Sequence, residues 1–211
     1  MAIILVFAGC AWFQPKEEKS SQELARDGME AFQARKYDNA IESFEKLKDY
    51  YPFSKFAMLA ELKIADSYFH LKQYDEAIFA YEEFERLHPR NEAIPYVIYQ
   101  IGYCYYQQMD TVDRDQTSTQ KALEAFERLT KQFPNDSHTV SAKELILNCL
   151  KTLAGHEFYV GYYYYKMKHY KAALHRFKNI LTYYPDVGLH YKALQYITLC
   201  EASIKKIESK N

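Results

Sequence analysis

The chain has 211 residues, and its 27 Lys and Arg against 28 Asp and Glu give a formal net charge of -1 at pH 7, so no basic excess marks nucleic acid as a partner. With 48% hydrophobic residues but only 6 Gly and 6 Pro, the composition favours a helical protein with a sizeable core over a turn-rich β-sandwich. The 21 Tyr and 13 Phe are typical of an interlocked helical core or an aromatic binding surface.

An uncharged apolar run begins at residue 2 and ends at Cys10. It is typical of the back half of a signal peptide and is too short to span a membrane, which takes about 20 apolar residues. The segment Phe7-Ala8-Gly9-Cys10 resembles a bacterial lipobox, whose cysteine is acylated and becomes the mature N-terminus. We therefore predict a signal-peptide remnant at residues 1–9 and a lipidated Cys10 with a linker at residues 10–20. A frayed apolar helix end is the alternative.

The residue after the cysteine is Ala11 rather than Asp. By resemblance to bacterial lipoprotein sorting, this favours the outer membrane over the inner membrane. Several acyl chains on Cys10 would anchor the protein durably, whereas a single chain binds a membrane only marginally.

One block with the spacing Ala-x3-aromatic-x7-Pro recurs along the rest of the chain. Its four copies are Ala40, Phe44 and Pro52; Ala77, Tyr81 and Pro89; Ala122, Phe126 and Pro134; and Ala173, Phe177 and Pro185. The spacing matches the second helix of the tetratricopeptide repeat. Alanine suits a close crossing of two helices, the aromatic residue one turn later fills the gap, and proline ends the helix. Such helix pairs bury their apolar faces only by stacking on one another.

The repeat predicts an all-α tetratricopeptide-repeat solenoid of about nine helices in four and a half pairs, in a single domain at residues 21–208. The predicted helices are 21–34, 38–50, 55–71, 75–87, 93–108, 118–132, 137–167, 171–183 and 188–208. The seventh lacks proline, so it is either continuous or kinked near Gly155. The three cysteines after Cys10 fall within helices, and their odd number indicates no structural disulfide framework.

The third repeat contains an insertion. Successive repeat prolines are 45 residues apart there and 37 in the repeat before, and the eight additional residues fall within 107–118. Insertions in a solenoid lie on one face and are often functional. Asp113, Arg114 and Asp115 are therefore our candidate partner-binding loop.

The same segment partly matches a calcium-binding loop. Positions 1, 3, 5 and 12 of such a loop would be Asp113, Asp115, Thr117 and Glu124. However, Ser118 replaces the glycine of position 6, and Glu124 should already be helical. We favour a capping box, with Thr117 as the N-cap and Gln120 three residues later.

The first helices of the stacked pairs should line the concave surface and form an aromatic trough there. Its candidate peptide-binding residues are Phe32, Phe69, Tyr99 and Tyr103, with the cations Arg26 and Lys63 beside them. A cation at such a site would suit a carboxylate. The alternative is that these aromatic side chains pack between adjacent helices.

No motif points to catalysis. The six glycines lie at least six positions apart, which excludes a P-loop, a dinucleotide fingerprint and a Gly-x-Ser-x-Gly nucleophile elbow. The seven histidines show no zinc-site spacing. A hydrolase on a helical scaffold would need a converging nucleophile and base that no motif shows. We therefore predict no enzymatic activity, no cofactor and no metal.

The lipobox-like start, the repeats, the charged insertion, the Tyr50-Tyr51-Pro52-x-Ser54 segment and the long helix after Pro134 together resemble the BamD family of outer-membrane lipoproteins. The resemblance implies a non-catalytic scaffold on the periplasmic face of the outer membrane. Such a scaffold binds the barrel protein BamA and other subunits of the β-barrel assembly machinery, and receives unfolded outer-membrane proteins. The C-termini of these clients, which end in an aromatic residue, would bind the trough. The alternative is a periplasmic tetratricopeptide adaptor that uses the same groove without handling barrel substrates.

Overall fold

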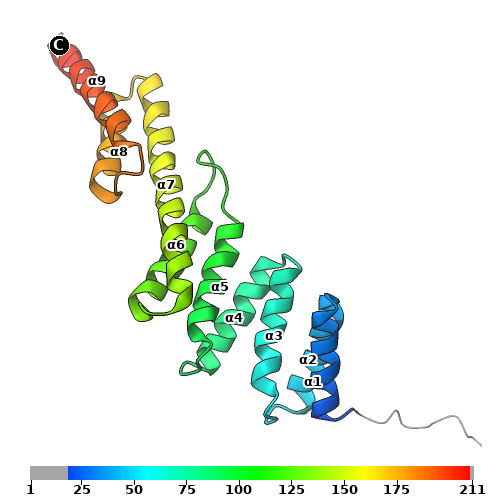
Figure 1. Ribbon diagram of the computed structural model, residues 1–211. Coiled ribbons are helices and arrows are strands. Elements are labelled where there is room, and N and C mark those ends of the chain that lie inside the picture. The colour runs from blue at the N-terminus through cyan, green and yellow to red at the C-terminus, as the bar shows by residue number, and fades with distance from the viewer. Residues whose placement is uncertain (1–18, 210–211) are drawn as a thin grey trace, which may run out of the picture.

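The computed structural model describes residues 19–209, which are all-α and form nine helices without a strand (Figure 1). The helices are α1 (Ser21–Gln33), α2 (Tyr37–Tyr50), α3 (Ala57–His70), α4 (Tyr74–Leu87), α5 (Ile94–Gln107), α6 (Thr117–Gln132), α7 (Ser137–Lys166), α8 (Tyr170–Tyr183) and α9 (His190–Glu208). Every predicted helix is present, with its ends within two residues of the prediction. The predicted all-α class, with helices packed pairwise, is confirmed.

Each helix packs mainly on the helices next to it in sequence, and the molecule is elongated (Figure 1). Helices α1–α6 form a stack of three antiparallel pairs. The 30-residue α7 then leads from this stack to the C-terminal helices α8 and α9. It is one uninterrupted helix, which resolves the question of a break near Gly155. Among residues 19–209, no helix combines the length and apolar content needed to cross a bilayer.

The repeated alanine and aromatic residues form the packing contacts that their spacing predicts. All four alanines and all four aromatic side chains of the block are fully buried. The aromatic ring of a second helix lies directly on the backbone of the first helix of its pair. A Cβ atom on Gly28 would come within 2.6 Å of the Phe44 ring, and one on Gly102 within 2.8 Å of the Phe126 ring. These glycines therefore permit the close approach of the two helices.

The turns inside three of the pairs share one backbone conformation. Arg35, Lys72 and Lys168 have φ of 58°, 60° and 63°, in the left-handed region that non-glycine residues rarely adopt. Each lies between the first and second helix of its pair, and the turns are closed by bonds such as Lys36 N–H to Ala31 O at 2.9 Å. In the third pair, the insertion between α5 and α6 takes the place of this turn.

The core consists of three clusters of buried side chains along the stack. One lies between α1, α2 and α3, the largest extends from α3 to α7, and the last joins α8 and α9 to the second half of α7. The two halves of α7 thus pack in different clusters. Through this helix, the C-terminal cluster is attached to the rest of the stack.

The cysteines of the described residues lie in these clusters. Cys104, Cys149 and Cys200 are fully buried with free thiols. Burial raises the pKa of the Cys104 and Cys149 thiols to about 12 and also raises the pKa of Cys200. All three thiols therefore stay protonated at neutral pH and act as apolar core residues.

Candidate functional site: the aromatic trough and the insertion loop

Three of the candidate trough residues lie in direct contact. The Phe69 ring on α3 is 5.9 Å from the Tyr103 ring on α5, and Tyr103 stacks on Tyr99 at 5.8 Å with an angle of 10° between the rings. On its other side, Tyr103 stacks on Tyr106 at 6.0 Å. All four rings pack against the core and remain partly exposed. They therefore combine helix packing with an accessible aromatic surface.

Phe32 extends this row to α1 through a histidine. His70 lies edge-to-face at 5.6 Å from both Phe32 and Phe69, and it stacks on Tyr37 at 4.7 Å. Sequence reasoning missed His70 and Tyr37. Both could have been added to the prediction from their positions, since His70 directly follows Phe69 and Tyr37 begins α2. We call the row Phe32, His70, Phe69, Tyr103, Tyr99 and Tyr106 the aromatic trough from here on.

Lys63 lies at the trough but already has a partner. Its ammonium is 4.7 Å from the centre of the Phe32 ring and 2.7 Å from Oδ2 of Asp66. The lysine side chain is 22% exposed, so a ligand can still reach it. A carboxylate arriving at Lys63 would share the ammonium with Asp66.

Asp66 is the centre of a buried polar network that the sequence did not reveal. Its residue is only 4% exposed, and its Oδ1 accepts hydrogen bonds from Tyr81 at 2.7 Å and Tyr96 at 2.8 Å. Burial, followed by the charge of Asp66, raises the pKa of both tyrosines, so their hydroxyls remain donors. Because Tyr81 is on α4 and Tyr96 on α5, the network joins three helices beneath the trough.

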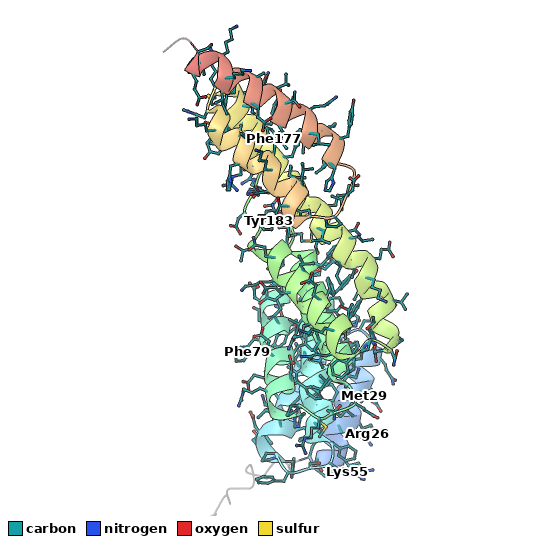
Figure 2. All side chains as sticks on the ribbon, turned by 90° about the vertical axis from the view of Figure 1, so that its left-hand side faces the viewer. Arg26, Met29, Lys55, Phe79, Phe177 and Tyr183 are labelled. Carbon is teal, nitrogen blue, oxygen red and sulfur yellow. The ribbon has the colours of Figure 1, made fainter. Side chains whose placement is uncertain are left out.

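Arg26 makes no contact with the rings of the aromatic trough. Its side chain is 64% exposed and pairs with its own helix, at 3.3 Å from Asp27 and 3.8 Å from Glu30. Figure 2 shows Arg26 and Met29 on the same side of the N-terminal half. The structure thus brings five of the six candidate peptide-binding residues together and leaves Arg26 beside them without a ring contact.

The insertion loop between α5 and α6 is held by one buried side chain. Gln116 is 5% exposed, and its amide nitrogen donates to the carbonyl oxygens of Thr111 at 2.9 Å and Arg114 at 3.1 Å. Its amide oxygen accepts from the Thr119 hydroxyl at 2.9 Å. This clamp leaves the side chains of Asp113, Arg114 and Asp115 exposed.

The same loop docks on the middle of α7. His156 Nδ1 lies 2.7 Å from the carbonyl oxygen of Val112, so in the tautomer that carries the proton there it donates to this oxygen. A Cβ on Gly155 would lie 2.9 Å from Cγ1 of Val112. Gly155 therefore provides room for the loop rather than a bend in the helix.

The predicted capping box at the start of α6 is wrong. The helix begins at Thr117 with Gln116 as its N-cap residue, and no side chain caps it from that position. Instead, the carboxylate of Asp115 accepts from the Thr117 N–H at 2.9 Å. Hydrogen bonding from the side chain of Thr117, and then from its backbone, keeps the pKa of Asp115 below its usual range. Gln116 takes the N-cap position because its buried side chain bonds to the loop and so fixes where the helix begins.

Glu124 lies within α6, away from the loop, and residues 19–209 contain no group of three His, Cys, Asp or Glu side chains suited to a metal ion. Cys10, the predicted lipidation site, and residues 1–9 lie outside the described residues.

A family of outer membrane lipoproteins, YfiO, matches residues 17–210. The chain belongs to this family. Its relatives include the outer membrane protein assembly factor BamD of Rickettsia prowazekii, which is 31% identical over 92% of this chain and 78% of its own length. The BamD of Neisseria gonorrhoeae is 27% identical over 92% of this chain and 76% of its own. Among solved structures, the MamA protein is similar with 16% identity over 88% of each chain and a TM-score of 0.45.

The resemblance to the BamD family that the sequence predicted is thus confirmed. The chain is a member of a family of outer membrane protein assembly factors, which is non-catalytic, and the prediction that it is not an enzyme agrees with this.

Proposed function

We propose that the chain is a lipid-anchored scaffold of the β-barrel assembly machinery on the periplasmic face of the outer membrane. In this proposal the aromatic trough receives the C-termini of unfolded outer-membrane proteins. The exposed loop residues Asp113, Arg114 and Asp115 contact a BamA-like barrel protein, and other subunits of the machinery join this assembly. The observation that supports client binding best is the continuous row of partly exposed rings across α1, α3 and α5.

The chemistry of the trough suits a chain end with a terminal aromatic residue. Rings fixed on rigid helices lose little freedom when a partner ring packs on them, so a few contacts give useful but reversible affinity. The exposed part of Lys63 offers one hydrogen-bonded contact to the terminal carboxylate. Because Asp66 already shares this ammonium, we assign most of the affinity to the rings.

Replacing Phe69 with Ala tests the trough. We expect binding of a peptide from a barrel-protein C-terminus to weaken by about 1–3 kcal/mol, because a packed aromatic contact is lost. Titration of the fluorescent peptide, with a free and with an amidated C-terminus, measures this. Amidation should weaken binding less than Phe69→Ala, and its effect should shrink with added salt.

The control for this titration is Tyr183→Ala, which removes a 71% exposed tyrosine on α8, a helix that carries no trough residue. It should bind the peptide like the wild type. Circular dichroism of both variants separates binding from folding. Matching isotherms for the wild type and a folded Phe69→Ala variant would show that the trough is not the client site.

Anchoring is tested by Cys10→Ser. Expressed with a complete signal sequence, the wild type should fractionate with outer membranes, whereas the variant should be soluble in the periplasm, because its acyl chains are lost. Mass spectrometry of the mature N-terminus measures the modification directly. An unmodified wild-type N-terminus would refute the lipid anchor while leaving the trough proposal standing.

A further inference from the structure

A second surface lies between α2 and α4, with α3 as its floor. It is a groove of about 490 Å³. The residues that line it are Glu45 and Lys48 from α2; Glu61, Ile64 and Tyr68 from α3; and Asp75, Glu76, Phe79, Ala80, Glu83, Phe84 and Leu87 from α4. In Figure 2, Phe79 lies on the side opposite Arg26 and Met29. None of the six trough residues lines it, so the groove is separate from the aromatic trough.

The groove combines a buried apolar floor with exposed apolar side chains on its α4 wall. Ile64 and Phe84 are buried beneath it. On the wall, the Phe79 residue is 68% exposed and Leu87 is 49% exposed. Large apolar side chains that flank a concave surface in this way mark a protein interaction site.

The rim of this groove is acidic. Five carboxylates line it against the single cation Lys48. Two of them have partners, since Glu61 bonds to His88 and Glu83 to Arg86. Within the described residues, the structure shows no hydrogen bond or ion pair for Glu45, Asp75 or Glu76. The negative charge of the rim is thus largely uncompensated.

The negative charge of the rim also acts on the hydroxyl of Tyr68 inside the groove. Its pKa is raised first by burial and then by the negative charges of Glu45 and Glu76. The two carboxylates come from different walls, α2 and α4. A positive charge between these walls would therefore be attracted from both sides.

The groove is elongated along α4. Asp75, Phe79, Glu83 and Leu87 follow one another at four-residue spacing and so lie on one face of this 14-residue helix. At 1.5 Å per residue, the face is about 20 Å long, which matches three to four turns of a partner helix. Alternating acidic and apolar side chains along it match a helix with basic and apolar residues at the same spacing.

We propose that this groove binds a basic amphipathic helix of a partner protein. Aliphatic or aromatic side chains of the partner pack against Phe79 and Leu87, and its Lys or Arg side chains face Glu45, Asp75 and Glu76. Charge complementarity selects this occupant, because an acidic or neutral apolar helix would leave the three unpaired carboxylates facing a desolvating surface.

The test is a titration of the full chain with a 14-residue helical peptide of Leu and Lys, acetylated and amidated so that it has no free carboxylate. Phe79→Ala should weaken binding about tenfold through loss of a packed aromatic contact. Glu76→Lys should also weaken it about tenfold and reduce its salt dependence, because an attraction becomes a repulsion. The same peptide with Glu in place of Lys should not bind.

Matched controls decide whether the groove itself is responsible. Tyr183→Ala removes a similarly exposed aromatic residue, and Glu144→Lys reverses an exposed charge on α7. Both should bind the peptide like the wild type. Equal weakening by control and groove variants would mean non-specific attraction and would overturn the proposal. Phe69→Ala should leave this binding unchanged, so a failure here is distinguishable from a failure of the client trough.

The chain's single tryptophan, Trp12, serves as a further readout. If the partner is another protein, Phe79→Ala should leave the emission of Trp12 unchanged. A shift in the emission of Phe79→Ala, reproduced in the wild type by adding the Leu–Lys peptide, would show that the chain's own N-terminal segment occupies the groove and is displaced from it. That result would overturn the assignment to a separate partner.

Discussion

Asp66→Ala is expected to lower the free energy of unfolding by about 3 kcal/mol. The substitution leaves the hydroxyls of Tyr81 and Tyr96 without their acceptor beneath the trough, and an unsatisfied buried polar group costs about 1–3 kcal/mol. It also removes the partner of Lys63, whose ammonium can turn toward solvent because it is partly exposed. Thermal denaturation should show a fall in Tm of about 6–12 °C for a chain of this size.

Tyr81→Phe is the matched control for this network. It removes one hydroxyl and leaves Asp66 with Tyr96 and Lys63, so we expect a loss of only about 1 kcal/mol. In the double variant, the two effects should be less than additive, since both remove the same bond. A Tm for Asp66→Ala equal to that of Tyr81→Phe would contradict a central role for the carboxylate.

Ala77→Phe is the second substitution with a large expected effect. Ala77 is fully buried in the cluster that extends from α3 to α7, and no space remains for a ring. Overpacking of this kind costs about 1–3 kcal/mol or more, because neighbouring side chains leave their preferred rotamers or the helices move apart. The free energy of unfolding from urea denaturation measures this loss.

The matched control is Ala202→Phe, which places the same ring on an exposed position of α9. There the change should stay within about 0.5 kcal/mol, as is usual for surface substitutions. An unchanged denaturation midpoint for Ala77→Phe would show that α4 does not cross its neighbours tightly at Ala77.

The helices were predictable because their determinants are local and repeated. The spacing of Ala77, Tyr81 and Pro89 places a small residue where two helices cross, an aromatic ring one turn later and a proline that ends the helix. This prediction needs no knowledge of contacts between residues distant in sequence. The start of α6 was predicted wrongly because Gln116 bonds to the loop before it, which a capping rule based on neighbouring residues does not consider.

The site was predictable only in part, for a physical reason. The regular spacing of first helices predicted that Phe69, Tyr99 and Tyr103 lie together, and they do. In contrast, the pairing of Lys63 with Asp66 depends on Tyr81 and Tyr96 arriving from two other helices. The acidic groove had a local signal in the four-residue spacing on α4, but its depth requires α2 and α3 as well.

The division of the core into three clusters has a mechanical consequence. Because each helix packs mainly on its sequence neighbours, the chain has low contact order, and the α1–α3 cluster is complete without any residue of α8 or α9. We therefore expect loss of the packing around Phe177, near the C-terminal end in Figure 2, to destabilise that end of the molecule and to leave the aromatic trough folded. The molecule is thus expected to unfold section by section, so that both proposed binding surfaces are retained in chains whose C-terminal section has already opened.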